Sequence, residues 1–223
     1  MKVTHLYHSG CLVELEHHLL LFDYYQGKLN LNPNKPLYVF VSHSHYDHYN
    51  PEIFKLNHPH ITYILSDSLP QQNQAYYVDV HQMNQIDDLS IQTLLSTDEG
   101  CAFLIQVENQ TIYHAGDLNW WHWAGEPEVD NEYQRITYQQ EINSIQKPID
   151  LACIVVDIRQ EKDYLLGLSY FLNHVPCRYI LPIHYFGHYE TTTLLFQEAI
   201  DNPYQAQILP VKHSNQTFEL PTQ

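Results

Sequence analysis

Four side chains of the kind that bind metal ions lie within a span of six residues: His43, His45, Asp47 and His48. Neutral imidazole and carboxylate are the ligands that suit zinc and other first-row divalent ions. Alternate residues of an extended segment point to the same side, so His43 and His45 can bind one ion together. Asp47 and His48 lie past the following bend and can face a second ion. The sequence has 16 histidines, but three of them beside a carboxylate predict a metal site rather than a merely polar loop.

Two more candidate ligands each follow an apolar segment that reads as a strand. Asp117, in the pair Gly116-Asp117, has two carboxylate oxygens and can therefore bridge two cations. His184 directly follows the apolar residues 179–183. Taken alone, Gly116-Asp117 is only weak evidence, because an ordinary turn aspartate would look the same, and His184 is more typical of a structural histidine. Both gain weight from being paired with the cluster at 43–48.

These residues must be positioned by strands. We expect strands at residues 2–8, 11–15, 19–23, 37–42, 61–65, 75–80, 89–95, 101–107, 111–114, 151–156, 178–182 and 207–211. We expect helices at residues 51–56, 130–147, 164–173 and 194–200. Strands dominate the first half of the chain, and strands and helices alternate in the second. This pattern predicts two sheets packed face to face with helices outside.

Composition limits the class of protein. The 223 residues contain no Pro/Gly/Ser-rich linker, which predicts a single domain over residues 1–223. The balance of 10 Lys+Arg against 26 Asp+Glu gives a net charge of -16. Nucleic acids and anionic membranes both require a basic surface, so neither is an expected partner. Without an apolar run long enough to span a membrane, we expect a cytoplasmic protein. The four separated cysteines predict buried free thiols.

The order His43-x-His45-x-Asp47-His48, Gly116-Asp117, His184 resembles that of the metallo-β-lactamase-fold hydrolases. The opening Tyr7-His8-Ser9-Gly10 looks like the branch of small hydrolases that includes ascorbate-phosphate lactonase. The resemblance covers residues 2 to about 184. It implies a four-layer αββα sandwich of class α/β.

When the metal ligands of the family are assigned to the matching positions of this sequence, the resemblance implies a site for two metal ions. His43 and His45 would bind the first ion, and the second would be bound by Asp47, His48 and His184. Asp117 would bridge the ions. Such ions lower the pKa of a bound water to about 7, which provides a metal-bound hydroxide at neutral pH. Asp23 is similar to a family aspartate that braces the histidine loop, although its place after an apolar strand is equally compatible with a turn cap.

The sequence departs from the family where a further histidine would bind the first ion. The corresponding loop, Ser96-Thr97-Asp98-Glu99-Gly100, contains none. Asp98 could replace it as an oxygen ligand, a water could fill the position, or Asp98 could be only a turn residue. His81 is a more distant alternative. The expected cofactor is therefore one or two Zn²⁺ ions, with Mn²⁺ or iron as alternatives.

Several neighbouring residues are candidates for contact with the substrate. The segment 120–123 follows Asp117 directly, so Trp120 and Trp121 could wall a pocket or only anchor a loop. Arg159 could bind an anionic group, or could pair with one of the many acidic residues. Tyr185 lies next to His184 and could donate a proton or stabilise an oxyanion.

The remaining expectations concern catalysis. His114 could orient Asp117 or belong to the core. Asp47, Asp117 and Tyr185 are the expected catalytic residues. The predicted reaction is hydrolysis of a small-molecule ester, lactone or phosphoester by a metal-bound hydroxide. An iron-dependent oxidoreductase on the same fold and a non-catalytic binding protein are the alternatives.

Overall fold

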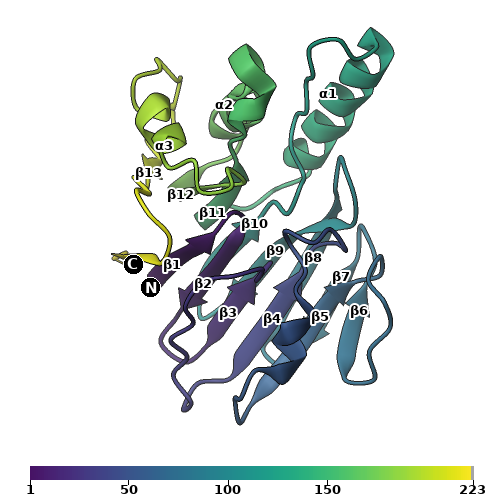
Figure 1. Ribbon diagram of the computed structural model, residues 1–223, viewed down its shortest axis with the longest axis vertical. Helices are drawn as coiled ribbons and strands as arrows, with labels where there is room; N and C mark the ends of the chain where they lie inside the picture. The colour runs from purple at the N-terminus through teal and green to yellow at the C-terminus, as the bar shows by residue number, and fades with distance from the viewer. Residues whose placement is uncertain (222–223) are drawn as a thin grey trace.

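The computed structural model describes residues 1–221, whose strands form two seven-stranded sheets (Figure 1). The first sheet has the order β14 (Gln216–Glu219), β1 (Lys2–Tyr7), β2 (Gly10–Glu14), β3 (Leu19–Phe22), β4 (Leu37–Val41), β5 (Ile61–Ser66) and β6 (Ala75–Val78). The second has the order β13 (Gln207–Ile208), β12 (Cys177–Ile183), β11 (Ile149–Val155), β10 (Gln110–His114), β9 (Cys101–Val107), β8 (Leu89–Leu95) and β7 (Met83–Ile86). The expected pair of sheets is confirmed.

The sheets pack face to face because their inner side chains share one core. Along β4, Tyr38 and Phe40 belong to the core between the sheets, and Phe40 meets Phe103 of β9 with ring centroids 5.3 Å apart. Val39 and Val41 point to the opposite face, where they pack with Ile53 in a second apolar cluster. Since β4 is buried on both faces, its sequence is an uninterrupted apolar run.

Helices cover the outer face of the second sheet. They are α1 (Glu128–Asn143), α2 (Leu166–His174) and α3 (Glu190–Leu195), which lie together on one side of the molecule (Figure 1). The ring of Phe171 in α2 stacks on Tyr113 of β10 at 5.6 Å, and the Tyr138 hydroxyl of α1 donates to the Gly167 carbonyl of α2 at 2.8 Å. On the first sheet, the outer layer consists of the loop from Tyr24 to Pro36 and the 3₁₀ turn η1 (Pro51–Lys55).

Some elements differ from the sequence expectation. The edge strands β7 and β14 were not expected, because their polar, half-exposed residues lack an apolar run. The helix expected at 194–200 lies instead at Glu190–Leu195. Its buried face includes Thr191 and Thr192, whereas Leu194 and Phe196, which suggested the later span, are exposed. The expected buried free cysteines are confirmed.

Strand direction brings the candidate residues to one edge of both sheets. In the first sheet, β3 and β4 are parallel and β1 runs in the same direction, so His8, Asp23 and His43 follow strand ends on one side. In the second sheet, β10, β11 and β12 are parallel, and Asp117 and His184 follow β10 and β12. Such carboxyl edges commonly carry ligand sites. Among residues 1–221, no helix is both long and apolar enough to cross a membrane.

The structure predicts that Gly100 cannot be replaced without disturbing the histidine loop. Gly100 has φ +68°, and an added Cβ would lie 1.9 Å from the Ser42 carbonyl oxygen. Gly125 also has positive φ (+91°), but an added Cβ would meet no atom within 4 Å. Backbone strain costs about 1–2 kcal/mol and overpacking about 1–3 kcal/mol more. In urea denaturation, Gly100→Ala should therefore lose about 3 kcal/mol and Gly125→Ala about 1 kcal/mol. Equal losses would contradict this packing.

Candidate metal centre

The Asp117 carboxylate lies at the centre of the candidate site. The Nε2 atom of His48 is 3.1 Å from Asp117 Oδ1, and that of His184 is 3.2 Å from the same oxygen. His43 Nε2 lies 3.5 Å from Asp117 Oδ2. All four residues are buried. Residues from both sheets therefore present imidazole nitrogens to one carboxylate, as expected of a centre that binds cations.

Asp23 is a buried orienting group. Its Oδ1 accepts the Ser42 backbone N–H at 2.8 Å, and its Oδ2 accepts the Ser42 hydroxyl at 2.7 Å. Its Oδ2 also lies 2.8 Å from His48 Nδ1. Burial alone would raise the pKa of Asp23, but His48 and nearby histidines lower it to about 2. The ionised carboxylate therefore holds the proton of His48 on Nδ1 and directs Nε2 into the site.

Asp157 does the same for His184, and sequence reasoning missed it. Its Oδ2 lies 3.0 Å from His184 Nδ1, and both of its oxygens accept the Nε–H of Arg159 at 2.9 Å. Burial would raise the pKa of Asp157, but His184 and Arg159 lower it to about 2. A sequence signal existed, because Asp157 follows a buried strand just as Asp23 does.

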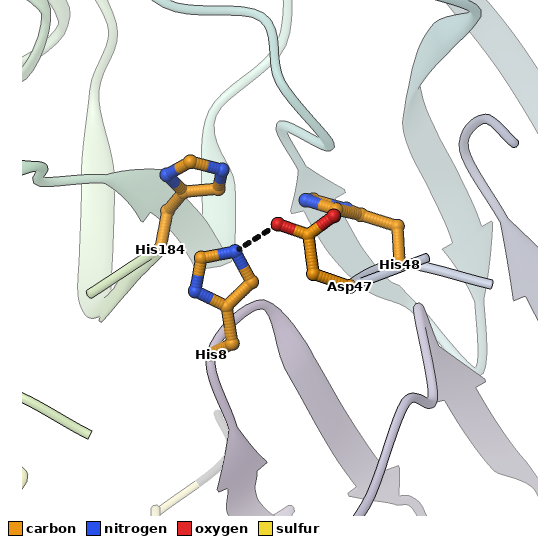
Figure 2. Close-up of side chains that lie close together, drawn as sticks. All are labelled: His8, Asp47, His48 and His184. Carbon is orange, nitrogen blue, oxygen red and sulfur yellow. Dashed lines mark ion pairs between the residues drawn. The ribbon is translucent and has the colours of Figure 1, made fainter. Parts of the chain in front are cut away.

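His8 is the second residue that sequence reasoning left without a role. It is buried in the turn after β1, and its Nε2 lies 3.1 Å from Asp47 Oδ2 (Figure 2). Each of His8, Asp47, His48 and His184 offers one potential ligand atom, and these atoms lie within 4.8 Å of one another. The only sequence signal was its place at a strand end, in the turn Tyr7-His8-Ser9-Gly10.

Asp98 lies beside the position expected for the first ion. Its Oδ2 is 3.7 Å from His45 Nδ1, and one ligand atom from each of His45, Asp98 and Asp117 lies within 4.8 Å of the others. His45 is partly exposed and also has Glu99 at 3.4 Å from Nε2. The loop 96–100 has no histidine and places the carboxylate of Asp98 beside His45. His81 contacts Glu141 instead, at 2.8 Å, and does not replace the missing ligand.

Unpaired buried atoms show that a metal ion fits this centre. Among the described residues, His8 Nε2, His48 Nε2 and Asp117 Oδ1 are buried without a hydrogen-bond partner, a condition that costs about 1–3 kcal/mol per group. Burial would lower the pKa of His184, but Asp117 and Asp157 raise it to about 9. Burial would likewise raise the pKa of Asp117, but His184 and His48 hold it well below its usual range. A divalent cation can occupy the position that these imidazole nitrogens and the Asp117 carboxylate face.

An open cleft leads to the candidate ligands. Its volume is about 430 Å³, and its walls outside the ligand set are Tyr46, Thr97, Trp121, Trp123, Gln134, Arg159 and Phe186. Trp121 and Trp123 stack with ring centroids 5.7 Å apart, and the Trp121 Nε1–H donates to the Asp117 carbonyl at 3.0 Å. The segment after Asp117 therefore forms an aromatic wall beside the site.

Three expectations about neighbouring residues need correction or refinement. Trp120 does not line the cleft; its ring meets Tyr170 of α2 edge-on at 6.1 Å, and Trp123 takes its place. Arg159 does line the cleft and also forms the expected salt bridge, with Asp157. His114 does not orient the Asp117 carboxylate. It lies 2.9 Å from the Ser9 carbonyl through Nε2 and accepts the Gly116 N–H through Nδ1.

The catalytic assignment of Tyr185 is wrong in this structure. Its side chain is buried, its ring stacks on His5, and its hydroxyl lies 3.1 Å from His5 Nε2. It does not line the cleft that contains His184. The backbone turns at His184, which has a positive φ of +74° just past the end of β12. Closeness in sequence to His184 was therefore a poor guide.

Comparisons with known proteins agree with this fold. Residues 2–122 match the beta-lactamase superfamily domain. Igni18, a metallo hydrolase from Ignicoccus hospitalis, is 16% identical with a TM-score of 0.65, over 99% of this chain and 100% of that chain. The metallo-beta-lactamase fold protein YhfI from Bacillus subtilis is 15% identical with a TM-score of 0.65, over 97% and 98%. CmlA, a diiron beta-hydroxylase from Streptomyces venezuelae, is 12% identical with a TM-score of 0.62, over 98% and 54%.

At these identities the solved structures show a shared fold and nothing finer. No curated protein matches the sequence significantly. The family match, however, covers more than half of the chain. The chain therefore belongs to the beta-lactamase superfamily and has the metallo-β-lactamase fold.

Proposed function

We propose that the protein is a metal-dependent hydrolase of a small-molecule ester, lactone or phosphoester. One observation carries the proposal: the Nε2 atoms of His43, His48 and His184 converge on Asp117 from two sheets. The Nδ1 atoms of His48 and His184 are hydrogen-bonded to buried carboxylates, which fix the orientation of both rings. A core with this many buried polar groups is costly unless a ligand satisfies them.

The proposed ligands fall into two sets that share Asp117. His43, His45 and Asp98 would hold the first ion, and Asp47, His48 and His184 the second. When bound, such ions polarise the substrate oxygen and lower the pKa of water to about 7. Asp47 stays ionised because contact with His8 and His48 outweighs its burial and lowers its pKa to about 2. Asp47 and Asp117 are therefore the proposed catalytic residues.

The cleft supports a small, partly apolar substrate with a negative or polar group. Trp121, Trp123 and Phe186 can cover its apolar part and exclude water. The Nε and Nη2 atoms of Arg159 contact Asp157, so the guanidinium is held in place at the cleft wall. Its remaining N–H groups can donate to a phosphate or carboxylate. The charge of -16 supports neither a nucleic-acid partner nor an anionic membrane, and we propose a cytoplasmic location.

An iron-dependent oxidoreductase is the second candidate, and Asp98 is the observation that favours it. An oxygen donor beside two histidines makes the first position harder than an all-histidine set, which suits manganese or iron better than zinc. Metal analysis of protein purified without added metal distinguishes the two. Stoichiometric zinc or manganese supports hydrolysis, whereas stoichiometric iron with a redox signal supports oxidoreduction. Protein without any bound metal would support the non-catalytic alternative.

The central carboxylate provides the first mutational test. Asp117→Asn keeps the shape but removes the charge, so it should weaken metal binding and lower kcat/KM by more than about 100-fold. Loss of groups that only orient ligands already costs about 10–100-fold. Calorimetric metal titration and a panel of ester, lactone and phosphoester substrates measure both effects. The exposed Asp201→Asn is the matched control, and equal behaviour of the two variants would contradict the proposal.

Asp98 provides a test of the first metal position. If Asp98 is a ligand, Asp98→Ala should lower the number of tightly bound ions from two to one, whereas Asp98→His should retain two. The histidine should also shift the preference from manganese toward zinc, because imidazole is the softer donor. Elemental analysis after dialysis against each metal measures both effects. Unchanged stoichiometry and preference in Asp98→Ala would show that Asp98 is only a turn residue.

A further inference from the structure

We propose that His8 does not bind metal but is a positioning residue, whose protonated Nε2 faces Asp47 and holds that carboxylate toward the second ion. This inference rests on the proposed metal-dependent function. Distance alone suggests otherwise, because His8 joins Asp47, His48 and His184 in a buried group with potential ligand atoms within 4.8 Å (Figure 2). The hydrogen bond at Nδ1 of each ring distinguishes a metal ligand from a positioning residue.

His48 and His184 have the tautomer that a metal ligand needs. Each places Nδ1 against a buried carboxylate, Asp23 at 2.8 Å and Asp157 at 3.0 Å. A carboxylate can only accept, so Nδ1 carries the proton. In the neutral ring, Nε2 then has a free lone pair directed into the site.

His8 has the opposite tautomer. The backbone N–H of Phe186 donates to His8 Nδ1 at 3.1 Å. A backbone N–H can only donate, so Nδ1 supplies a lone pair and the proton of the neutral ring lies on Nε2. A protonated nitrogen cannot coordinate a metal. Its nearest carboxylate oxygen is Asp47 Oδ2 at 3.1 Å. This contact is electrostatic, because the two atoms are not aligned for a hydrogen bond.

The ring of His8 is held so that this proton cannot easily be moved. It stacks on Phe186 with centroids 3.8 Å apart and lies 4.2 Å from the ring of His184. The backbone N–H of His184 also donates to the backbone carbonyl of His8 at 3.1 Å. Turning the ring over would break the bond from Phe186 in a fully buried position. With one Asp47 oxygen held by His8, the other is left for an ion, as is usual for ligating carboxylates.

Cadmium binding to the wild-type protein tests the proposal directly. We expect NMR with an NMR-active cadmium isotope and labelled histidine nitrogens to show metal–nitrogen coupling at Nε2 of His48 and His184. No such coupling should reach His8, whose Nε2 should carry a proton. Coupling to either nitrogen of His8 would overturn this inference but leave the proposed function standing. Absence of any bound cadmium would overturn both.

Two variants test the positioning role itself. Glutamine can place an N–H near the Nε2 position but coordinates metal poorly, whereas asparagine is too short and tolerates the positive φ of +53° at this residue. Zinc titration should show two ions in both variants. Affinity for the second ion should stay within about threefold of wild type in His8→Gln and fall about 10–100-fold in His8→Asn.

The contrary outcomes are equally specific. Loss of a whole ion from both variants would identify His8 as a ligand. Unchanged zinc affinity in His8→Asn would show that the contact with Asp47 has no positioning effect. If either variant failed to fold, the cadmium spectrum of the wild-type protein would still decide the tautomer of His8.

Discussion

The site depends on a hydrogen bond from a buried imidazole to a buried carboxylate, made once in each sheet. Asp23 holds His48 in the first sheet, and Asp157 holds His184 in the second. Each bond selects the tautomer and aims Nε2 at Asp117. A neutral ring with the other tautomer would turn a proton toward the cation position. At His8 the arrangement is the opposite, because a backbone N–H donates to Nδ1. The partner of Nδ1 therefore determines whether Nε2 carries a proton or a free lone pair.

This requirement explains why the site needs both sheets. The oriented histidines and Asp117 come from strand ends that meet at one edge, and the shared core fixes the distance between the sheets. The backbone N–H of Cys101 donates to the Ser42 carbonyl at 3.1 Å and joins the histidine loop to the second sheet. That same contact leaves no room for a side chain at Gly100. The loop that carries Asp98 is therefore placed by packing against the loop that carries His45.

The sequence was informative where chemistry is local and less so where it depends on tertiary contacts. The cluster at 43–48 and the strand before it could be recognised because ligands and apolar residues lie close together in the chain. Asp157 and His8 were missed because each acts through a residue more than 20 positions away. Tyr185 failed for the reverse reason, since its neighbour in sequence, His184, points to another side. The aromatic segment 120–123 was placed correctly beside Asp117, but only the structure shows that Trp123 faces the cleft and Trp120 faces α2.

The central claim is that carboxylates behind the histidines aim their Nε2 atoms at a shared metal position. Anomalous diffraction from zinc-loaded crystals tests it most directly, because it locates the ions and identifies the nitrogens that bind them. The account predicts zinc density bonded to Nε2 of His48 and His184 and to an oxygen of Asp117, with Nδ1 still facing Asp23 and Asp157. Zinc bonded through Nδ1, or no anomalous density at this edge of the sheets, would contradict it.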